Sequence, residues 1–515
     1  MDRGLLAVLL LLSLVIHWRV WPVTTKVKWG QGVWALVWWL LKPLWYAGIG
    51  MGLSLAGWTA WHSNPWLLAM ATVVLFLLSL RLRVFSETNA FKVERGAQLL
   101  PAPTQARASP LSLTLAGVAL RPADETKHFK FIGTTGTGKS TAIAELLTQA
   151  LSRGDRAVIA DPDGGYCRHW WNPACGDVIL NPFDARSVQW DPYRELRQPM
   201  DYDSLARALI PAVGRADAVW STYARVFLSE LLKRTQLVGL SSCAELMRLV
   251  QAASVVELRV LLNATPAAPF LEEGNERMFA SVRSVCMSAL SALQYVPASS
   301  AQGFSVRDWV SSDSRALFMP YHANEIASLR TLISTWMRLC IETTLSQTGE
   351  SRPLWFVVDE LDALGAIDGL KDALVRLRKH NGRCVLGFQS IGQLVGTYGE
   401  QDAKTIGENC ANTLLLRSSG SGPGGTARYA QDHVGDRQVL RRYAADTQPK
   451  RWGGAQGRSV SVSWQRTIEP ALLASEIEQL PDLSGFLKTA SDPNWRLVTL
   501  QPPWAAAPEP AGPGA

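Results

Sequence analysis

The chain has 515 residues, 47% of them apolar, and a formal net charge of +7. This apolar content excludes an intrinsically disordered chain, and the length suffices for about three domains of ordinary size. Nearly all of the basic excess lies in residues 1–85, so bulk charge gives no support for nucleic-acid binding by the remaining residues. The seven scattered cysteines contain no CxxC pair, which favours a reducing compartment over a disulfide scaffold or a zinc site.

Residues 1–85 are predicted to form a transmembrane region. The apolar stretches 43–61 and 66–80 are separated only by a short polar turn, which predicts a helical hairpin. Lys and Arg flank the pair, so the positive-inside rule places both flanks in the cytoplasm. Residues 5–18 are apolar but short, and we expect either a further span or a helix lying along the membrane. A cleaved signal peptide is rejected because it would place residues 133–140, whose GTTGTGKS pattern is typical of an ATP-binding loop, outside the cell and away from ATP.

The soluble part is predicted to be an α/β domain interrupted by helices. Residues 86–110 are rich in Ala and Pro and are expected to form a linker. Strands separated by helices of ordinary length then indicate a parallel sheet over 111–199 and 301–500. Residues 200–300 show helical periodicity and predict an all-α domain, while 501–515 are expected to be a disordered tail. The predicted strands are 128–132, 156–161, 177–182, 316–321, 355–360, 383–389 and 413–418.

A phosphate-binding loop follows the first of these strands. Residues 133–140 match G-x-x-x-x-G-K-[ST] without departure, and an amphipathic helix comes next. Such glycines let backbone N–H groups face phosphate oxygens, and the helix N-terminus adds its positive dipole end. Lys139 is expected to reach the β and γ phosphates, and Ser140 to hold Mg²⁺. The predicted ATP-binding residues are Gly133, Thr134, Thr135, Gly136, Thr137, Gly138, Lys139, Ser140 and Thr141.

Two further strand ends carry candidate catalytic residues. The apolar run 354–358 ends in Asp359 and Glu360, so Asp359 is expected to hold Mg²⁺ and Glu360 to polarise the attacking water. A solvated strand edge is the structural alternative. Gln389 ends another apolar strand and could sense the γ phosphate, or instead cap the following helix.

These motifs, taken in order, resemble the type IV secretion-system coupling proteins, the conjugative DNA-transfer coupling ATPases. The resemblance covers nearly the whole chain and rests on the following strings: GTTGTGKS, RGDRAVIADPDGGY, DVILNPFDAR, FSVRDWV, LWFVVDELDALG, RKHNGRCVLGFQS and IEQLPDLSGF. It implies a RecA-like P-loop NTPase domain with an inserted all-α domain, preceded by an N-terminal transmembrane hairpin. It also implies a multi-pass protein of the bacterial inner membrane with its ATPase body in the cytoplasm.

The resemblance further implies a function and a set of partners. The protein would be a homo-hexamer that hydrolyses ATP with Mg²⁺ and moves DNA of any sequence. It would bring a relaxase–DNA complex, the relaxosome, to the inner-membrane proteins of a type IV secretion channel, beside membrane lipid. Arg378 matches a family arginine proposed to reach a neighbouring subunit's ATP; otherwise it belongs to a solvated basic helix end. The alternatives are a membrane receptor that recruits this complex without pumping, and a protein-secretion ATPase.

Some positions depart from the family pattern or stay ambiguous. Gly165 stands where relatives often carry an acid, and Gly425 stands where relatives carry Lys, with Arg428 the nearest base. A second acid and a second trans-acting cation are therefore not expected from these positions. A basic run with interleaved Tyr443 and Trp452 either contacts DNA or forms an exposed loop. The run comprises Arg437, Arg441, Arg442, Lys450 and Arg451.

Overall fold

The computed structural model describes residues 91–101, 112–211, 218–296, 303–347, 352–447 and 459–502. The predicted spans 5–18, 43–61 and 66–80 lie outside these residues, as does the tail from 503 onward. Within the described ranges, no helix combines the length and the hydropathy that a bilayer crossing requires. The chain divides into two compact units, Met1–Arg95 with Gln438–Ile468, and Gly96–Arg437 with Glu469–Ala515.

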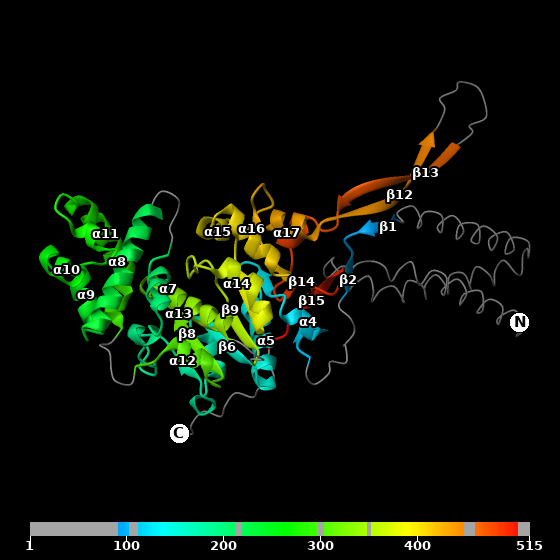
Figure 1. The fold of residues 1–515 in the computed structure, drawn as a ribbon. Coiled ribbons are helices and arrows are strands. Elements are labelled where there is room, and N and C mark those ends of the chain that lie inside the picture. The colour runs from blue at the N-terminus through cyan, green and yellow to red at the C-terminus, as the bar shows by residue number, and fades with distance from the viewer. Residues whose placement is uncertain are drawn as a thin grey trace, which may run out of the picture. The chain divides into compact units, whose positions relative to one another are not determined.

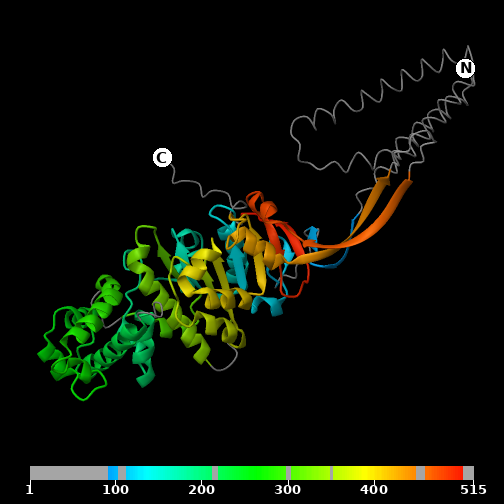
Figure 2. The ribbon, with the colours of Figure 1, turned by 90° about the horizontal axis from the view of Figure 1, so that it is seen from above.

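A ten-stranded sheet forms the centre of the second unit (Figures 1 and 2), with strand order β2-β15-β14-β11-β5-β10-β9-β6-β8-β7. The strands from β11 to β7 are parallel, and each corresponds to a predicted strand, so the expected parallel α/β sheet is confirmed. Their bounds are β5 (Phe129–Ile132), β6 (Arg156–Pro162), β7 (Val178–Ile179), β8 (Ala316–Tyr321), β9 (Leu354–Val358), β10 (Gly382–Phe388) and β11 (Asn412–Leu416).

The central strands are predominantly apolar because both of their faces are covered. Along β6, Ala157 and Ile159 pack into one core while Val158 and Ala160 pack into the other, as the alternation of side chains along a strand requires. Helix α5 (Lys139–Arg153) contributes its buried face to the first core, and α13 (Ile326–Ser346) contributes to the second.

One edge of the sheet was not predicted from the sequence. Strand β14 (Ser484–Lys488) runs antiparallel to β11, β15 (Trp495–Thr499) runs antiparallel to β14, and β2 (Leu99–Pro101) pairs with β15. These strands are short and only partly buried, so they lack the continuous apolar pattern of the central strands.

The remaining elements of this unit are short hairpin strands and helices. Between 199 and 296 every regular element that the structure describes is helical. The elements are β3 (Thr114–Leu115), β4 (Val118–Ala119), α4 (Pro122–Glu125), α6 (Gly165–Trp170), α7 (Pro199–Leu209), α8 (Ala218–Leu237), α9 (Cys243–Gln251), α10 (Val255–Leu261), α11 (Glu276–Leu290), α12 (Val306–Ser311), α14 (Leu370–Arg376), α15 (Ile391–Tyr398), α16 (Glu400–Asn409), α17 (Thr426–Val434) and α18 (Ala474–Glu478), with 3₁₀ turns η1 (Pro173–Cys175), η2 (Pro192–Glu195), η3 (Ala268–Leu271), η4 (Ser291–Tyr295) and η5 (Leu377–His380).

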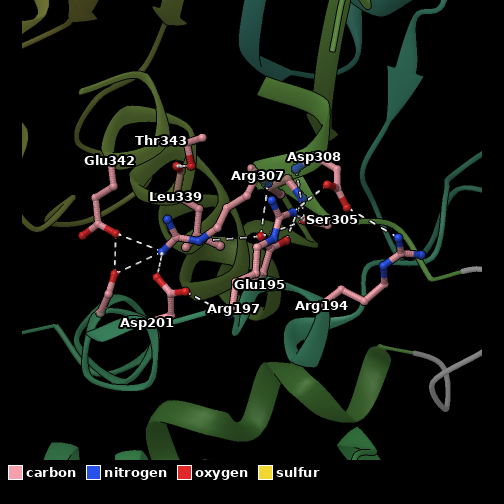
Figure 3. A network of polar contacts seen from close by, with 12 residues as sticks. Arg194, Glu195, Arg197, Asp201, Ser305, Arg307, Asp308, Leu339, Glu342 and Thr343 are labelled. Atoms are coloured by element: carbon pink, nitrogen blue, oxygen red, sulfur yellow. Dashed lines mark hydrogen bonds and ion pairs between the residues drawn. The ribbon is translucent and has the colours of Figure 1, made fainter. Parts of the chain in front are cut away.

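The chain passes from the sheet to these helices at η2 and returns to the sheet at α12. A buried polar network joins these two segments (Figure 3). Glu195 is fully buried and accepts hydrogen bonds from the Ser305 hydroxyl and from the backbone N–H groups of Val306 and Arg307. The Trp190 indole donates to the same carboxylate at 2.9 Å. Because every donor faces one carboxylate, the outgoing turn η2 and the returning helix α12 are fixed to each other.

A three-stranded ribbon comprises β1 (Phe91–Gly96), β12 (Asp436–Thr447) and β13 (Ser459–Pro470), in the order β1-β12-β13. Two expectations are corrected here. The segment 86–110 was expected to be a linker but contains strands β1 and β2. Each pairs with a strand hundreds of residues later, and a local sequence pattern cannot reveal such a partner. Arg437, Arg441 and Arg442 lie in β12 and not in a loop, while Lys450, Arg451 and Trp452 fall outside the described residues.

Candidate active site

The predicted phosphate-binding loop connects the carboxyl end of β5 to α5. Gly136 and Gly138 have φ angles of +77° and +117°, a backbone region that L side chains avoid. The Lys139 ammonium donates to the Gly133 carbonyl at 2.7 Å and to the Thr134 carbonyl at 3.2 Å. The loop therefore curls around its own lysine, and the side chains of Ser140 and Thr141 follow in the first turn of α5.

Asp359 follows β9, two strands from β5, and its side chain reaches the start of α5. The Ser140 hydroxyl donates to Asp359 Oδ2 at 2.6 Å. Asp359 Oδ1 is buried and has no hydrogen-bond partner within the described residues. A buried carboxylate oxygen without a donor, beside a serine hydroxyl, is a donor set that suits a hard divalent cation such as Mg²⁺.

Glu360 and Gln389 link this carboxylate edge to the loop. The Gln389 amide donates to Glu360 Oε1 at 3.0 Å, and the Thr135 hydroxyl donates to Gln389 Oε1 at 3.0 Å. Burial, followed by the charge of Asp359, raises the pKa of Glu360. Helix α15 is capped by Ser390, whose hydroxyl accepts from the Gly392 N–H, so Gln389 does not take the capping role.

The charges at this site are arranged around Lys139. Its side chain is largely buried, and burial lowers the pKa of the ammonium, whereas the carboxylates of Asp359, Glu360 and Asp362 raise it. The structure thus brings Lys139, Ser140, Asp359, Glu360 and Gln389 together at the carboxyl edge of the parallel strands, where α/β sheets bind ligands.

A family model described as "Type IV secretion-system coupling protein DNA-binding domain" matches residues 112–501. The chain belongs to this family. The coupling protein TraD of Escherichia coli (strain K12) is 30% identical over 374 residues, which cover 70% of this chain and 51% of TraD. The type IV secretion system-coupling protein VirD4 of Bartonella quintana (strain Toulouse) is 26% identical over 172 residues, or 31% of this chain and 27% of VirD4. The chain thus spans about half the length of TraD and less of VirD4.

Solved structures of the conjugative coupling protein TrwB share the fold. An unbound form has a TM-score of 0.71 and 29% identity, and the match covers 80% of this chain and 95% of that one. The complex of TrwB with the ATP analogue ADPNP has the same TM-score and 29% identity, and the match covers 80% of this chain and 94% of that one. The complex of TrwB with ADP and Mg²⁺ also has this TM-score, with 30% identity over 80% of this chain and 95% of that one. The RecA-like class expected for a coupling protein is confirmed.

Arg378 lies apart from the other predicted residues of this coupling protein. It is exposed in η5, before the amino end of β10, whereas Gln389 follows the carboxyl end. Seven strand residues at about 3.3 Å each separate the two positions. Arg378 is therefore too distant to reach the loop of its own chain.

Of the two departures from the coupling-protein pattern, the one at Gly425 has a local structural reason, whereas a Cβ on Gly165 would meet nothing within 4 Å. A Cβ on Gly425 would lie 2.0 Å from the Gly420 carbonyl oxygen, so this backbone leaves no room for a lysine. Arg428 pairs with Asp432 at 3.2 Å on the surface of α17. In the ribbon, Arg437 forms an ion pair with Glu469 at 2.9 Å, so the negative charge of Glu469 partly offsets the positive charge that Arg437 presents to other molecules.

Sequence reasoning missed two residues of the site. Tyr166, in α6, donates its hydroxyl to Asp359 Oδ2 at 2.7 Å, and the fully buried Asp161 accepts from the backbone N–H groups of Tyr166 and Cys167. The available signal was the position of DPDGGY directly after a predicted strand, on the same sheet edge as Asp359.

Proposed function

We propose that this chain is an inner-membrane, ATP-driven DNA translocase that brings a relaxase–DNA complex to a type IV secretion channel during conjugation. The observation that carries the proposal is the joining of Lys139, Ser140, Asp359, Glu360 and Gln389 at one sheet edge in a member of the coupling-protein family. Structures of the relative TrwB with ADPNP and with ADP and Mg²⁺ support ATP and Mg²⁺ as the cofactors.

Each site residue has a distinct part in the proposed hydrolysis. Lys139 binds the β and γ phosphates, and the backbone of 133–138 surrounds them. Ser140 and Asp359 hold Mg²⁺, which when bound neutralises charge on the phosphate oxygens. Glu360, with a pKa raised by burial, accepts a proton from the attacking water and orients it. Gln389 bridges Glu360 and Thr135, so the positions of the base and the loop are coupled.

The proposed assembly is a homo-hexamer with nucleotide between subunits. Its support is the position of Arg378, which is exposed at the opposite end of β10 from its own loop, where a neighbouring chain could approach it. DNA would be held through its backbone, because a translocase must accept any sequence. We propose that residues 1–85 cross the inner membrane more than once and keep the ATPase body in the cytoplasm, beside the channel proteins.

The decisive experiment measures hydrolysis and transfer in Glu360→Gln. This change keeps the side-chain shape but removes the base, so we expect nucleotide binding within twofold of the parent. ATP turnover by the full-length protein with DNA should fall roughly 10²–10⁴-fold. Conjugative transfer should be lost, and DNA should stimulate the parent's turnover. Glu408→Gln, an exposed acid of α16 with 67% of its side chain accessible, is the matched control.

A second candidate function is a membrane receptor that recruits the relaxase–DNA complex without pumping. It is favoured by exposed apolar side chains on the helical segment, where Val256 and Val260 of α10 are 67% and 76% exposed. Relaxase recruitment survives Glu360→Gln under both functions. Transfer that continues at the parent's rate in this variant would reject pumping and leave the receptor.

A further inference from the structure

Helix α6 supplies a side chain that the phosphate-binding motifs do not contain. The Tyr166 hydroxyl donates to Asp359 Oδ2 at 2.7 Å, and the Ser140 hydroxyl donates to the same oxygen at 2.6 Å. Tyr166 is 3% exposed, so its side chain is buried. One carboxylate oxygen therefore carries two donors, while Oδ1 stays available on the other side.

The position of Tyr166 is fixed by contacts of its backbone and its ring. Asp161 lies one residue before the end of β6, is fully buried, and accepts from the N–H groups of Tyr166 at 3.0 Å and Cys167 at 2.6 Å. Both Asp161 oxygens are engaged by the start of α6, so this acid anchors the helix. The Tyr166 ring also stacks on Trp170 with centroids 6.0 Å apart. These contacts hold the ring in place without any contribution from the hydroxyl.

The two donors to Asp359 Oδ2 differ in what they can do when a metal ion binds. A serine hydroxyl binds a cation through a lone pair while its proton can still be donated to the carboxylate, so its position depends on where the metal lies. The Tyr166 hydroxyl instead lies on a buried ring that is held by the Asp161 anchor and by Trp170, so its position as a donor to Asp359 does not depend on the metal. Tyr166 is thus the partner that keeps the Asp359 carboxylate from rotating.

We propose that Tyr166 is a positioning residue for the divalent cation, which holds the Asp359 carboxylate so that Oδ1 stays directed to the metal. This inference rests on the proposed nucleotide site and adds a residue to it. Partners that orient a metal-binding carboxylate typically contribute about 10–100-fold to metal affinity. We therefore expect the parent protein to bind nucleotide tightly at a lower Mg²⁺ concentration than a variant without the Tyr166 hydroxyl.

Tyr166→Phe tests the hydroxyl alone, because the ring and its stacking on Trp170 remain. Binding of N-methylanthraniloyl-ADP to the full-length protein is measured by fluorescence over a series of Mg²⁺ concentrations, with EDTA as the metal-free point. We expect metal-free affinity within twofold of the parent. The Mg²⁺ concentration at half-maximal effect should rise about tenfold.

Tyr193→Phe is the matched control, since Tyr193 is also buried and its hydroxyl contacts Thr235 at 2.9 Å, away from the site. It should leave the Mg²⁺ midpoint unchanged. An unchanged midpoint in Tyr166→Phe would overturn the inference, as would an equal loss of affinity with and without Mg²⁺, which indicates a structural role. A parent protein that binds no nucleotide would instead reject the proposed function.

A second variant covers the case in which Tyr166→Phe does not fold. Asp161→Asn keeps the Tyr166 side chain but removes one anchor of its helix, and it should also raise the Mg²⁺ midpoint, by about threefold or more. A folded Asp161→Asn protein with the parent's midpoint would contradict the positioning role.

Discussion

His128 is a buried residue whose two ring nitrogens contact different elements. Nε2 lies 2.8 Å from the Leu374 carbonyl at the end of α14, and the Cys384 N–H of β10 donates to Nδ1 at 3.0 Å. The carbonyl requires a proton on Nε2 and the N–H requires a lone pair on Nδ1, so the neutral tautomer is fixed. Burial above all, with the charges of Arg383 and Arg378, lowers its pKa to about 4.

This lowered pKa predicts a pH-dependent stability. Between pH 6.5 and about 4 the unfolded chain binds a proton at His128 that the folded chain does not. The contribution of His128 is therefore complete above pH 6.5 and is lost as pH falls toward 4, by about 3 kcal/mol. Urea denaturation of the parent should show this decline, and His128→Gln should show a decline smaller by that amount.

His322→Gln serves as the control, because the His322 side chain is 59% exposed. The free energy of unfolding of this variant should depend on pH as that of the parent does. Equal pH dependence in the parent and in His128→Gln would show that His128 takes up a proton in the folded state as easily as in the unfolded chain.

At the scale of elements, the joint of η2 and α12 is expected to be the most sensitive point outside the active site (Figure 3). Glu195→Ala leaves the Trp190 indole, the Ser305 hydroxyl and two backbone N–H groups buried without an acceptor. We expect the free energy of unfolding to fall by about 3–5 kcal/mol. Asp203→Ala removes an exposed ion pair with Arg207 and should cost about 0–1 kcal/mol.

Chemical denaturation of both variants checks this difference. If the free energy of unfolding of Glu195→Ala is no lower than that of Asp203→Ala, water has replaced the lost acceptor. The contact between η2 and α12 then does not depend on the Glu195 carboxylate.

The central strands could be predicted because burial on both faces imposes a local pattern. Strands such as β8 (ALFMPY) and β9 (LWFVV) are unbroken runs of apolar residues. Strands β1 and β2 could not, because their partners are distant in sequence, and β14 and β15 could not, because they are short and their faces are partly exposed. At the site, Asp359 and Gln389 end predicted strands, whereas Tyr166 is positioned by a buried acid whose contacts are all to backbone N–H groups.

At the scale of the whole molecule, the separation of Arg378 from its own loop predicts complementation between subunits. Arg378→Ala would inactivate the neighbour's site, whereas Glu360→Gln inactivates its own. Each variant alone should show little DNA-stimulated ATP turnover. A one-to-one mixture should recover activity at up to about a quarter of sites, since an intact Glu360 can then face an intact Arg378.

Lys379→Ala is the matched control for this experiment, as an exposed cation of the same turn, and should keep the parent's turnover. A mixture no more active than its two components would exclude Arg378 as a residue that acts across subunits.

The network around Glu195 also bears on how such a protein can diversify. The chain leaves the sheet at Glu195 and returns at Ser305, 110 residues later, and the two side chains are hydrogen-bonded at 3.0 Å. Both ends of the inserted helices therefore meet at one point, far along the sheet order from β5 and the phosphate-binding loop. An insertion whose two ends meet at one point can change in length or surface without moving the strands that carry the phosphate-binding loop.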